Sequence, residues 1–285
     1  MIRAAVRITF LRVQNAGVCM FLAAFFIAAA HADQVSGAEK VSFGGVFGWW
    51  LPASGAEPRP AVIGLHGCNG LYVRGELSAR ERGLAELLRS RGFHILLPDS
   101  FTPRGLRELC TTAVAQRTLR AADRRADIQG ALDWLAARPE VDRARIVVIG
   151  WSHGGSAVLA ALNHRIGVQP LQARAAVAFY PGCSPYARTE GSYLPVAPLL
   201  ILIGALDDWT PPAPCVELGK WTPKVSVVVF PGSHHGFDHP SSRVRVRTDV
   251  PGGVKRGEGV TVGSNPKARE RAYAALLEFL ERELR

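Results

Sequence analysis

Short, continuous apolar runs alternate along the chain with longer segments that are apolar on one face only. The runs have the length and composition of strands that are covered on both faces. They lie at residues 61–65, 94–98, 145–150, 175–180, 199–203 and 225–230. Helical spacing of apolar residues is found at residues 78–91, 119–137, 156–164 and 265–284. This alternation predicts an α/β protein with a doubly wound, mostly parallel sheet.

Three further segments do not fit this alternation. Residues 41–51 alternate loosely and carry four aromatic side chains, which predicts a strand or hairpin at a sheet edge. Residues 99–119 have no regular pattern, and residues 238–264 form a long loop rich in glycine and arginine. The irregular segment 99–119 follows the end of a strand, where substrate selection is expected in α/β proteins.

The N-terminal segment has the pattern of a secretory signal. Basic residues come first, an apolar run follows at residues 18–30, and Ala30-His31-Ala32 precedes Asp33. We therefore predict a signal peptide at residues 1–32, a single α/β domain at 33–285, and an exported protein that is periplasmic or secreted. The apolar run is shorter than the roughly 20 residues that span a bilayer, so no stable membrane insertion is expected after cleavage. Retention of the segment as an anchor is the alternative.

Composition and charge exclude several other classes. With 48% hydrophobic and 20% charged residues, the chain is neither a disordered nor a collagen-like protein. The net charge of +10 falls to +7 without the signal, which leaves 31 bases against 24 acids. The two signs are interspersed, as on solvated helix faces, so the charge does not indicate nucleic-acid binding.

Four cysteines remain outside the predicted signal, and disulfides persist in an oxidising compartment. Four cysteines allow three pairings. Because the residues of each pair follow strands that are expected to be neighbours, we predict the bridges Cys68–Cys110 and Cys183–Cys215.

The sequence Gly150-Trp151-Ser152-His153-Gly154 matches G-x-S-x-G at the point where an apolar strand meets a helix of small residues. In that context the serine can occupy a strained turn with its hydroxyl exposed above the sheet. Ser152 is therefore the candidate nucleophile, and a serine nucleophile needs a base that is oriented by an acid.

Candidates for both partners follow later strands. The 199–203 run ends in Gly204-Ala-Leu-Asp207-Asp208, where we favour Asp207 as the acid over its neighbour Asp208. The 225–230 run leads to His234-His235-Gly236, and we favour His235 as the base over His234.

An oxyanion needs two preorganised backbone N–H donors. The residue after the nucleophile, His153, is expected to supply one, and Cys68, in the loop after the first mapped strand, the other. For the side chains of His66 and His153 we expect structural roles.

Together these motifs resemble the dienelactone hydrolase family of α/β-hydrolases over roughly residues 40–284. The resemblance rests on the sequences His66-Gly-Cys-Asn-Gly70, Gly150-Trp-Ser-His-Gly154, Gly204-Ala-Leu-Asp207 and His235-Gly-Phe-Asp238. It implies a triad of Ser152, Asp207 and His235, with Cys68 and His153 as oxyanion donors. The lactone-hydrolysing members carry cysteine where Ser152 stands and an acidic residue where Gly67 stands. The resemblance therefore points to an exported serine branch that acts on another ester.

These observations predict a serine hydrolase of small carboxylic esters that works through an acyl-enzyme and needs no cofactor or metal. A serine peptidase on the same fold and a non-enzymatic binding protein are the alternatives. His234, His235, Asp238 and His239 cluster in sequence, but their spacing is not a zinc pattern.

Substrate selection has two sequence candidates near the predicted site. We expect an apolar crevice edged by Trp151, Trp209 and Tyr180, and Arg104 and Arg107 as residues that attract a carboxylate. Ordinary solvated arginines are the alternative.

Overall fold

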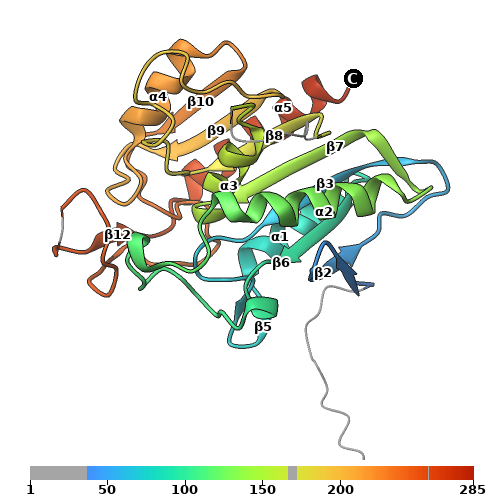
Figure 1. The fold of residues 1–285 in the computed structure, drawn as a ribbon, viewed down its shortest axis with the longest axis horizontal. Coiled ribbons are helices and arrows are strands. Elements are labelled where there is room, and N and C mark those ends of the chain that lie inside the picture. The colour runs from blue at the N-terminus through green and yellow to red at the C-terminus, as the bar shows by residue number, and fades with distance from the viewer. Residues whose placement is uncertain (1–36, 166–171, 256) are drawn as a thin grey trace, which may run out of the picture. The chain divides into compact units, whose positions relative to one another are not determined.

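The computed structural model describes residues 37–165, 172–255 and 257–285 (Figure 1). The predicted signal peptide at residues 1–32 lies outside the described residues. Among the described residues, no helix is both long and apolar enough to cross a bilayer.

A central sheet of eight strands organises the described chain, in the order β1-β2-β6-β3-β7-β8-β9-β10. From β6 to β10 all neighbours are parallel, whereas β1 and β2 form an antiparallel hairpin whose second strand pairs antiparallel with β6. The strands are β1 Glu39–Phe43, β2 Val46–Leu51, β3 Arg59–Leu65, β6 His94–Asp99, β7 Val141–Trp151, β8 Ala175–Phe179, β9 Leu199–Gly204 and β10 Val225–Phe230. The predicted α/β class with a mostly parallel sheet is confirmed, as is the edge hairpin.

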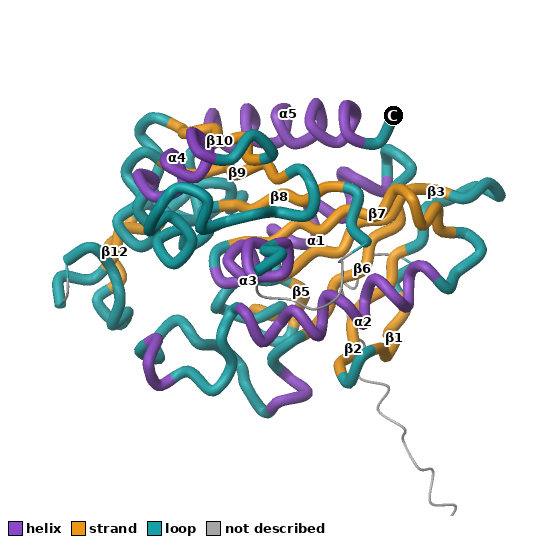
Figure 2. The backbone as a smooth tube through the Cα atoms, turned by 45° about the horizontal axis from the view of Figure 1, so that its top comes forward, coloured by secondary structure: helices purple, strands orange, loops and turns teal. Residues whose placement is uncertain are grey.

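Helices cover the sheet on both sides, and every residue of β6, β8 and β9 is buried between them. Figure 2 shows α2 and α3 together on one side of the sheet and α5 on the other. The α-helices of the described chain are α1 Ala79–Arg89, α2 Arg125–Ala136, α3 His153–Leu162, α4 Pro212–Trp221 and α5 Pro266–Glu283. Burial on both faces explains why the strand sequences are continuously apolar.

The structure differs from the sequence expectation in several segments. The helix predicted at 119–137 begins at Arg125, after the 3-10 turn Ala122–Arg124. The helix predicted to begin at residue 156 begins at His153, directly after Ser152. Helix α4 was not predicted, since its two prolines and glycine hide the helical spacing. Two small antiparallel pairs were also missed, β4 Tyr72–Val73 with β5 Glu76–Leu77 and β11 Arg245–Arg247 with β12 Val260–Val262.

Candidate active site

Ser152 lies in the sharp turn between β7 and α3, with φ 50° and ψ −112°. A positive φ is strained for a residue with a side chain. The flanking glycines permit this turn, because a Cβ on Gly150 would lie 2.4 Å from the Gly154 oxygen, and one on Gly154 would lie 2.2 Å from the Leu65 oxygen. The Ser152 N–H donates to the Phe179 oxygen at 2.9 Å, which ties the turn to the end of β8. The sequence motif therefore corresponds to a strained strand-to-helix turn.

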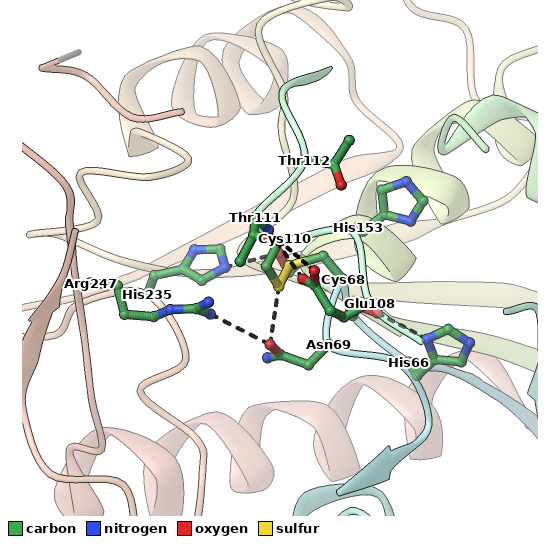
Figure 3. The surroundings of a disulfide bond; sticks show 12 residues. His66, Cys68, Asn69, Glu108, Cys110, Thr111, Thr112, His153, His235 and Arg247 are labelled. Carbon is green, nitrogen blue, oxygen red and sulfur yellow. Dashed lines mark hydrogen bonds between the residues drawn. A yellow bond between two sulfur atoms is a disulfide. The ribbon is translucent and has the colours of Figure 1, made fainter. Parts of the chain in front are cut away.

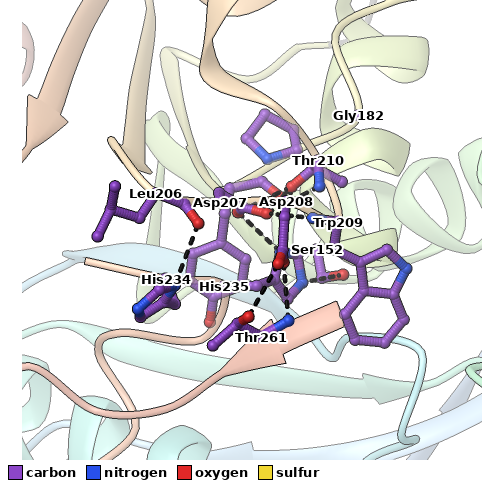
Figure 4. Close-up of polar contacts among 12 residues, drawn as sticks. Ser152, Gly182, Leu206, Asp207, Asp208, Trp209, Thr210, His234, His235 and Thr261 are labelled. Atoms are coloured by element: carbon purple, nitrogen blue, oxygen red, sulfur yellow. Dashed lines mark hydrogen bonds and ion pairs between the residues drawn. The ribbon is translucent and has the colours of Figure 1, made fainter. Parts of the chain in front are cut away.

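A chain of hydrogen bonds connects Ser152, His235 and Asp207 (Figure 4). His235 Nε2 lies 2.9 Å from Ser152 Oγ, and His235 Nδ1 lies 2.8 Å from Asp207 Oδ2. Asp207 and His235 are buried, at 3% and 4% exposure, whereas Ser152 is half-buried and reachable from solvent. With the Nδ1 proton donated to Asp207, Nε2 is left as an acceptor for the serine hydroxyl.

Backbone groups at the end of β9 hold Asp207. Its Oδ1 accepts from the N–H groups of Trp209 and Thr210 at 3.0 and 2.8 Å. The Thr210 hydroxyl lies 3.0 Å from Asp207 Oδ2 and 3.0 Å from the Tyr180 oxygen. These contacts fix the carboxylate in the orientation that meets His235.

The two neighbouring candidates point elsewhere. His234 Nδ1 lies 3.1 Å from the Leu206 oxygen. Asp208 accepts from the N–H and the hydroxyl of Thr261, both at 2.8 Å. Of each adjacent pair, only one member reaches the serine network.

The loop after β3 lies beside Ser152. A Cβ on Gly67 would lie 3.6 Å from Ser152 Cβ and 3.3 Å from the Trp151 oxygen, so the backbone of this loop approaches the turn closely. Cys68 follows in the same loop, and its carbonyl accepts from Leu109 N–H at 2.7 Å. On the other side, the His153 N–H belongs to the first turn of α3, where backbone donors have no intrahelical acceptor.

Two disulfides connect loops at the sheet ends. Cys68 is bonded to Cys110 and Cys183 to Cys215, which are the predicted pairings. Figure 3 shows the Cys68–Cys110 bond next to Asn69 and Glu108. The first bridge therefore attaches the loop that contains Cys68 to the irregular segment after β6.

A fully buried arginine connects the two sides of this region. Arg124 Nη1 donates to the His66 oxygen at 2.7 Å and contacts His153 Nδ1 at 3.4 Å, while Nε donates to Ser100 Oγ at 3.0 Å. Among the described residues, no carboxylate forms an ion pair with Arg124, and its Nη2 has no hydrogen-bond partner. Burial lowers the pKa of Arg124 to about 10, so the guanidinium stays charged at neutral pH.

Both neighbouring histidines are neutral, because each is buried near this charge. Burial, together with Arg124 and Arg117, lowers the pKa of His153 to about 3. Burial and the Arg124 charge also hold the pKa of His66 well below its ordinary value. His66 Nε2 accepts from Ser100 N–H at 3.2 Å, and Nδ1 donates to the Gly67 oxygen at 2.9 Å. The expected structural role of His66 agrees with these contacts.

The crevice that we expected from Trp151 and Tyr180 is not formed by these two side chains, because both are fully buried. Trp151 Nε1 donates to Asp238 Oδ2 at 2.8 Å, and the Tyr180 hydroxyl donates to Asp238 Oδ1 at 2.6 Å. The rings of Tyr180 and Trp209 pack against His235, with centroid distances of 4.6 and 4.8 Å. Tyr180 thus supports the candidate base, and of the three aromatic side chains only Trp209 is half-buried.

Arg104 is also placed differently from the expectation. Its guanidinium pairs with Asp127, with nitrogen–oxygen distances of 2.7 and 3.1 Å, and donates to the Ser100 oxygen. It therefore holds the irregular segment against α2 and is not free to attract a carboxylate. Arg107 is exposed, and no structural contact assigns it to substrate.

Several polar residues near the site could not be identified from the sequence. Arg80 donates to the Tyr180 hydroxyl at 3.0 Å and pairs with Glu81 at 2.6 Å, which extends the Asp238 network. Arg80 and Arg124 lie in segments whose charge pattern is typical of a solvated face, so no sequence signal marks them. Within the described residues, no group of three His, Cys, Asp or Glu side chains is placed to hold a metal ion.

A strained serine between a buried parallel strand and a helix, with its histidine and acid after later strands, defines the α/β-hydrolase fold. Residues 50–284 match the model of the dienelactone hydrolase family, and the chain belongs to this family. The family resemblance seen in the sequence is thereby confirmed.

Comparison with solved structures shows the same fold at low sequence identity. A dienelactone hydrolase from Klebsiella pneumoniae superposes with a TM-score of 0.61 at 19% identity, over 86% of this chain and 98% of that chain. A dienelactone hydrolase-like promiscuous phosphotriesterase from metagenomic libraries has a TM-score of 0.60 at 22% identity, over 87% and 98%. Esterase 2 of Thermogutta terrifontis, in a propionate-bound structure, has a TM-score of 0.55 at 20% identity, over 86% and 95%.

One curated relative carries a different kind of name. A protein of Mycobacterium tuberculosis named a phosphoribosyl transferase is 29% identical over 195 residues, which are 67% of this chain. The match spans only 39% of that relative, so its name describes a longer protein.

Proposed function

We propose that the protein is a serine hydrolase that cleaves carboxylic esters through an acyl-enzyme. The observation that carries this proposal is the uninterrupted hydrogen-bond chain from Ser152 Oγ through His235 to Asp207. A binding protein on the same scaffold would not need these three side chains in contact. The presence of two disulfides is compatible with export, which stays part of the proposal.

In the proposed reaction, Ser152 Oγ attacks the ester carbonyl carbon while His235 Nε2 takes its proton. The carbonyl oxygen becomes an oxyanion, for which the backbone N–H groups of Cys68 and His153 are the proposed donors. Collapse of this intermediate expels the alcohol, which receives the proton from His235. Water then attacks the acyl-serine by the same route, and the acid is released.

Labelling of the purified protein with a fluorophosphonate tests the proposal directly, because this reagent phosphonylates an activated serine. We expect one equivalent on Ser152, located by peptide mass spectrometry, and turnover of p-nitrophenyl esters in a panel of acyl lengths. A protein that neither takes the label nor hydrolyses any ester would contradict the proposed function.

The Cys68–Cys110 disulfide should affect activity as well as stability. Replacing both cysteines with serine removes a bridge across 42 residues, which the chain-entropy model values at about 4 kcal/mol of unfolding free energy. We also expect kcat to fall by about tenfold, since small displacements of an oxyanion donor are costly. Chemical denaturation measures the loss of unfolding free energy. The value of kcat, determined well below the unfolding temperature, measures the loss of turnover.

The Cys183–Cys215 bridge provides the control. It spans 32 residues, so its removal should cost a similar unfolding free energy. If both double variants lose kcat equally, the Cys68 loop has no special part in turnover.

Arg124 is expected to act as a positioning residue for the oxyanion site. Its hydrogen bond to His66 and its contact with His153 join the loop of one proposed donor to the helix of the other. We expect Arg124→Met to lower kcat by roughly tenfold or more while KM changes little, because the charge and the alignment matter most in the transition state.

Inhibition by a boronic acid that mimics the tetrahedral intermediate separates this role from simple stabilisation. Its affinity should fall in parallel with kcat in Arg124→Met and recover partly in Arg124→Lys. Arg104→Gln, which breaks the pair with Asp127, serves as the matched control. Unchanged boronate affinity in Arg124→Met would remove Arg124 from this role.

A further inference from the structure

Exposed apolar side chains gather on the β11–β12 hairpin and on the turn bonded to it. Among the described residues, eight large apolar side chains are exposed, and four of them lie here. They are Leu206 at 51%, Val244 and Val246 at 57% each, and Val254 at 61% exposure. Single exposed apolar residues are ordinary, whereas a cluster of them marks an interaction surface.

Asp208 holds these residues together. Its carbonyl accepts from Val254 N–H at 2.8 Å, and its carboxylate accepts from Thr261, the strand partner of Val246. Leu206 is two residues before Asp208 in the same turn. The four apolar side chains therefore belong to one bonded unit, which we call the valine hairpin: β11, β12, residues 243, 244, 254 and 255, and the turn 206–208.

Basic side chains alternate with the valines. Arg243 and Arg245 are exposed on either side of Val244. Lys255, at 72% side-chain exposure, follows Val254 and pairs with Glu258 at 3.2 Å. Arg247 pairs with Asp249 at 2.8 Å and, unlike the other three, has a mostly buried side chain. Apolar side chains flanked by unburied bases are complementary to a lipid surface, where acyl chains lie below anionic phosphates.

The valine hairpin adjoins the proposed triad. Val262 forms a bridge with His235, and Gly263 N–H donates to the His235 oxygen at 3.1 Å. Arg247 lies 5.7 Å from the Trp209 ring centroid and contacts Asn69, next to Cys68, at 3.4 Å (Figure 3). The valine hairpin is thus bonded directly to the backbone of His235 and contacts the loop that contains Cys68.

We propose that the valine hairpin docks the protein on an anionic phospholipid surface, from which Ser152 receives its ester substrate. The docking is inferred from the hairpin alone, whereas the delivery of substrate to Ser152 rests on the proposed function. The valines insert among the acyl chains at the interface, and Arg243 and Arg245 meet the lipid phosphates. The substrate class is accordingly an ester dissolved in a lipid phase.

Flotation of the purified protein with vesicles tests the docking. The vesicles are made of phosphatidylcholine alone or of equal parts phosphatidylcholine and phosphatidylglycerol, at about 0.05 M and about 0.5 M salt, since salt screens exposed charges. We expect binding only to the anionic vesicles, weakened by salt. Arg243→Gln with Arg245→Gln should lower vesicle affinity roughly 25-fold, about fivefold for each base. Val244→Ser with Val246→Ser should lower it at least about tenfold.

Matched controls lie outside the hairpin. Lys224→Gln neutralises an exposed base at the start of β10, the end far from His235, and Val73→Ser removes an apolar side chain that is 53% exposed on β4. Both should bind like the unaltered protein. If Arg243→Gln with Arg245→Gln loses binding while Val244→Ser with Val246→Ser binds fully, the partner is a soluble polyanion and the lipid proposal is overturned. Equal binding by all variants would overturn it as well.

Turnover separates this inference from the proposed function. With soluble p-nitrophenyl acetate, both hairpin variants should keep kcat/KM. With a long-chain ester embedded in anionic vesicles, their rate should fall by about the same factor as their affinity for the vesicles. Equal rates on the embedded ester would contradict delivery from the surface. A protein that binds vesicles but hydrolyses neither ester would contradict the proposed function and leave docking intact.

Discussion

Ser152→Ala is expected to reduce ester turnover by at least about 10⁴-fold and to eliminate fluorophosphonate labelling. Loss of a serine nucleophile leaves only the contributions of substrate binding and of the oxyanion site, which account for the small residual rate in enzymes of this kind. The melting temperature should not fall, because the variant loses one hydroxyl from a half-buried position. The measurements are kcat/KM on p-nitrophenyl acetate, intact mass after labelling, and thermal unfolding.

Ser226→Ala is the matched control for this variant, since Ser226 is exposed on β10. It should retain both activity and the label. If Ser152→Ala keeps turnover near the level of the unaltered protein, Ser152 is not the nucleophile and the proposed mechanism is wrong.

His235→Ala and Asp207→Asn should have the next largest effects. His235 is the base that contacts Ser152 Oγ, so we expect its removal to cause a loss of kcat close to that of Ser152→Ala. Asp207→Asn removes the charge that orients His235 and stabilises its protonated form, and a loss of about 10³- to 10⁴-fold follows. Both are measured as kcat on a soluble ester, with circular dichroism to verify the fold.

The adjacent residues provide internal controls for this pair. His234→Ala removes a contact with a backbone oxygen, and Asp208→Asn weakens the contacts to Thr261, so each should change kcat by less than about tenfold. An inactive His234→Ala beside an active His235→Ala would show that the other histidine is the base.

The sequence contains strong signals for the sheet and for the position of Ser152. Strands buried on both faces must be continuously apolar, so β6, β8 and β9 are visible as runs, and their order along the chain follows. The G-x-S-x-G pattern is equally direct, since the close backbone approaches at Gly150 and Gly154 exclude any side chain. The adjacency of β3 with β6 and of β8 with β9 then makes the two disulfide pairings predictable.

Side-chain environment could not be predicted in the same way. Trp151 and Tyr180 end two apolar strands, and nothing local tells whether such a ring faces a crevice or a buried acid such as Asp238. The roles of Arg104 and Arg124 depend on partners far along the chain, Asp127 and His66. For such residues the decisive information is tertiary, because a polar side chain in an irregular segment has no periodicity to reveal its contacts.

The backbone strain at Ser152 also bears on how the protein could be made more stable. Among the described residues, three other than glycine have a positive φ, and Ser152 at 50° and Tyr180 at 38° are two of them, both at the proposed triad. Holding side chains in this region costs on the order of 1–3 kcal/mol each. Selection for thermal tolerance alone would therefore favour glycine at Ser152, where that change would remove the proposed nucleophile. At Tyr180 glycine would not help, because the fully buried ring and its hydrogen bond to Asp238 would be lost. Heat resistance in this chain should instead be sought in replacements far from the carboxyl ends of β7 and β8.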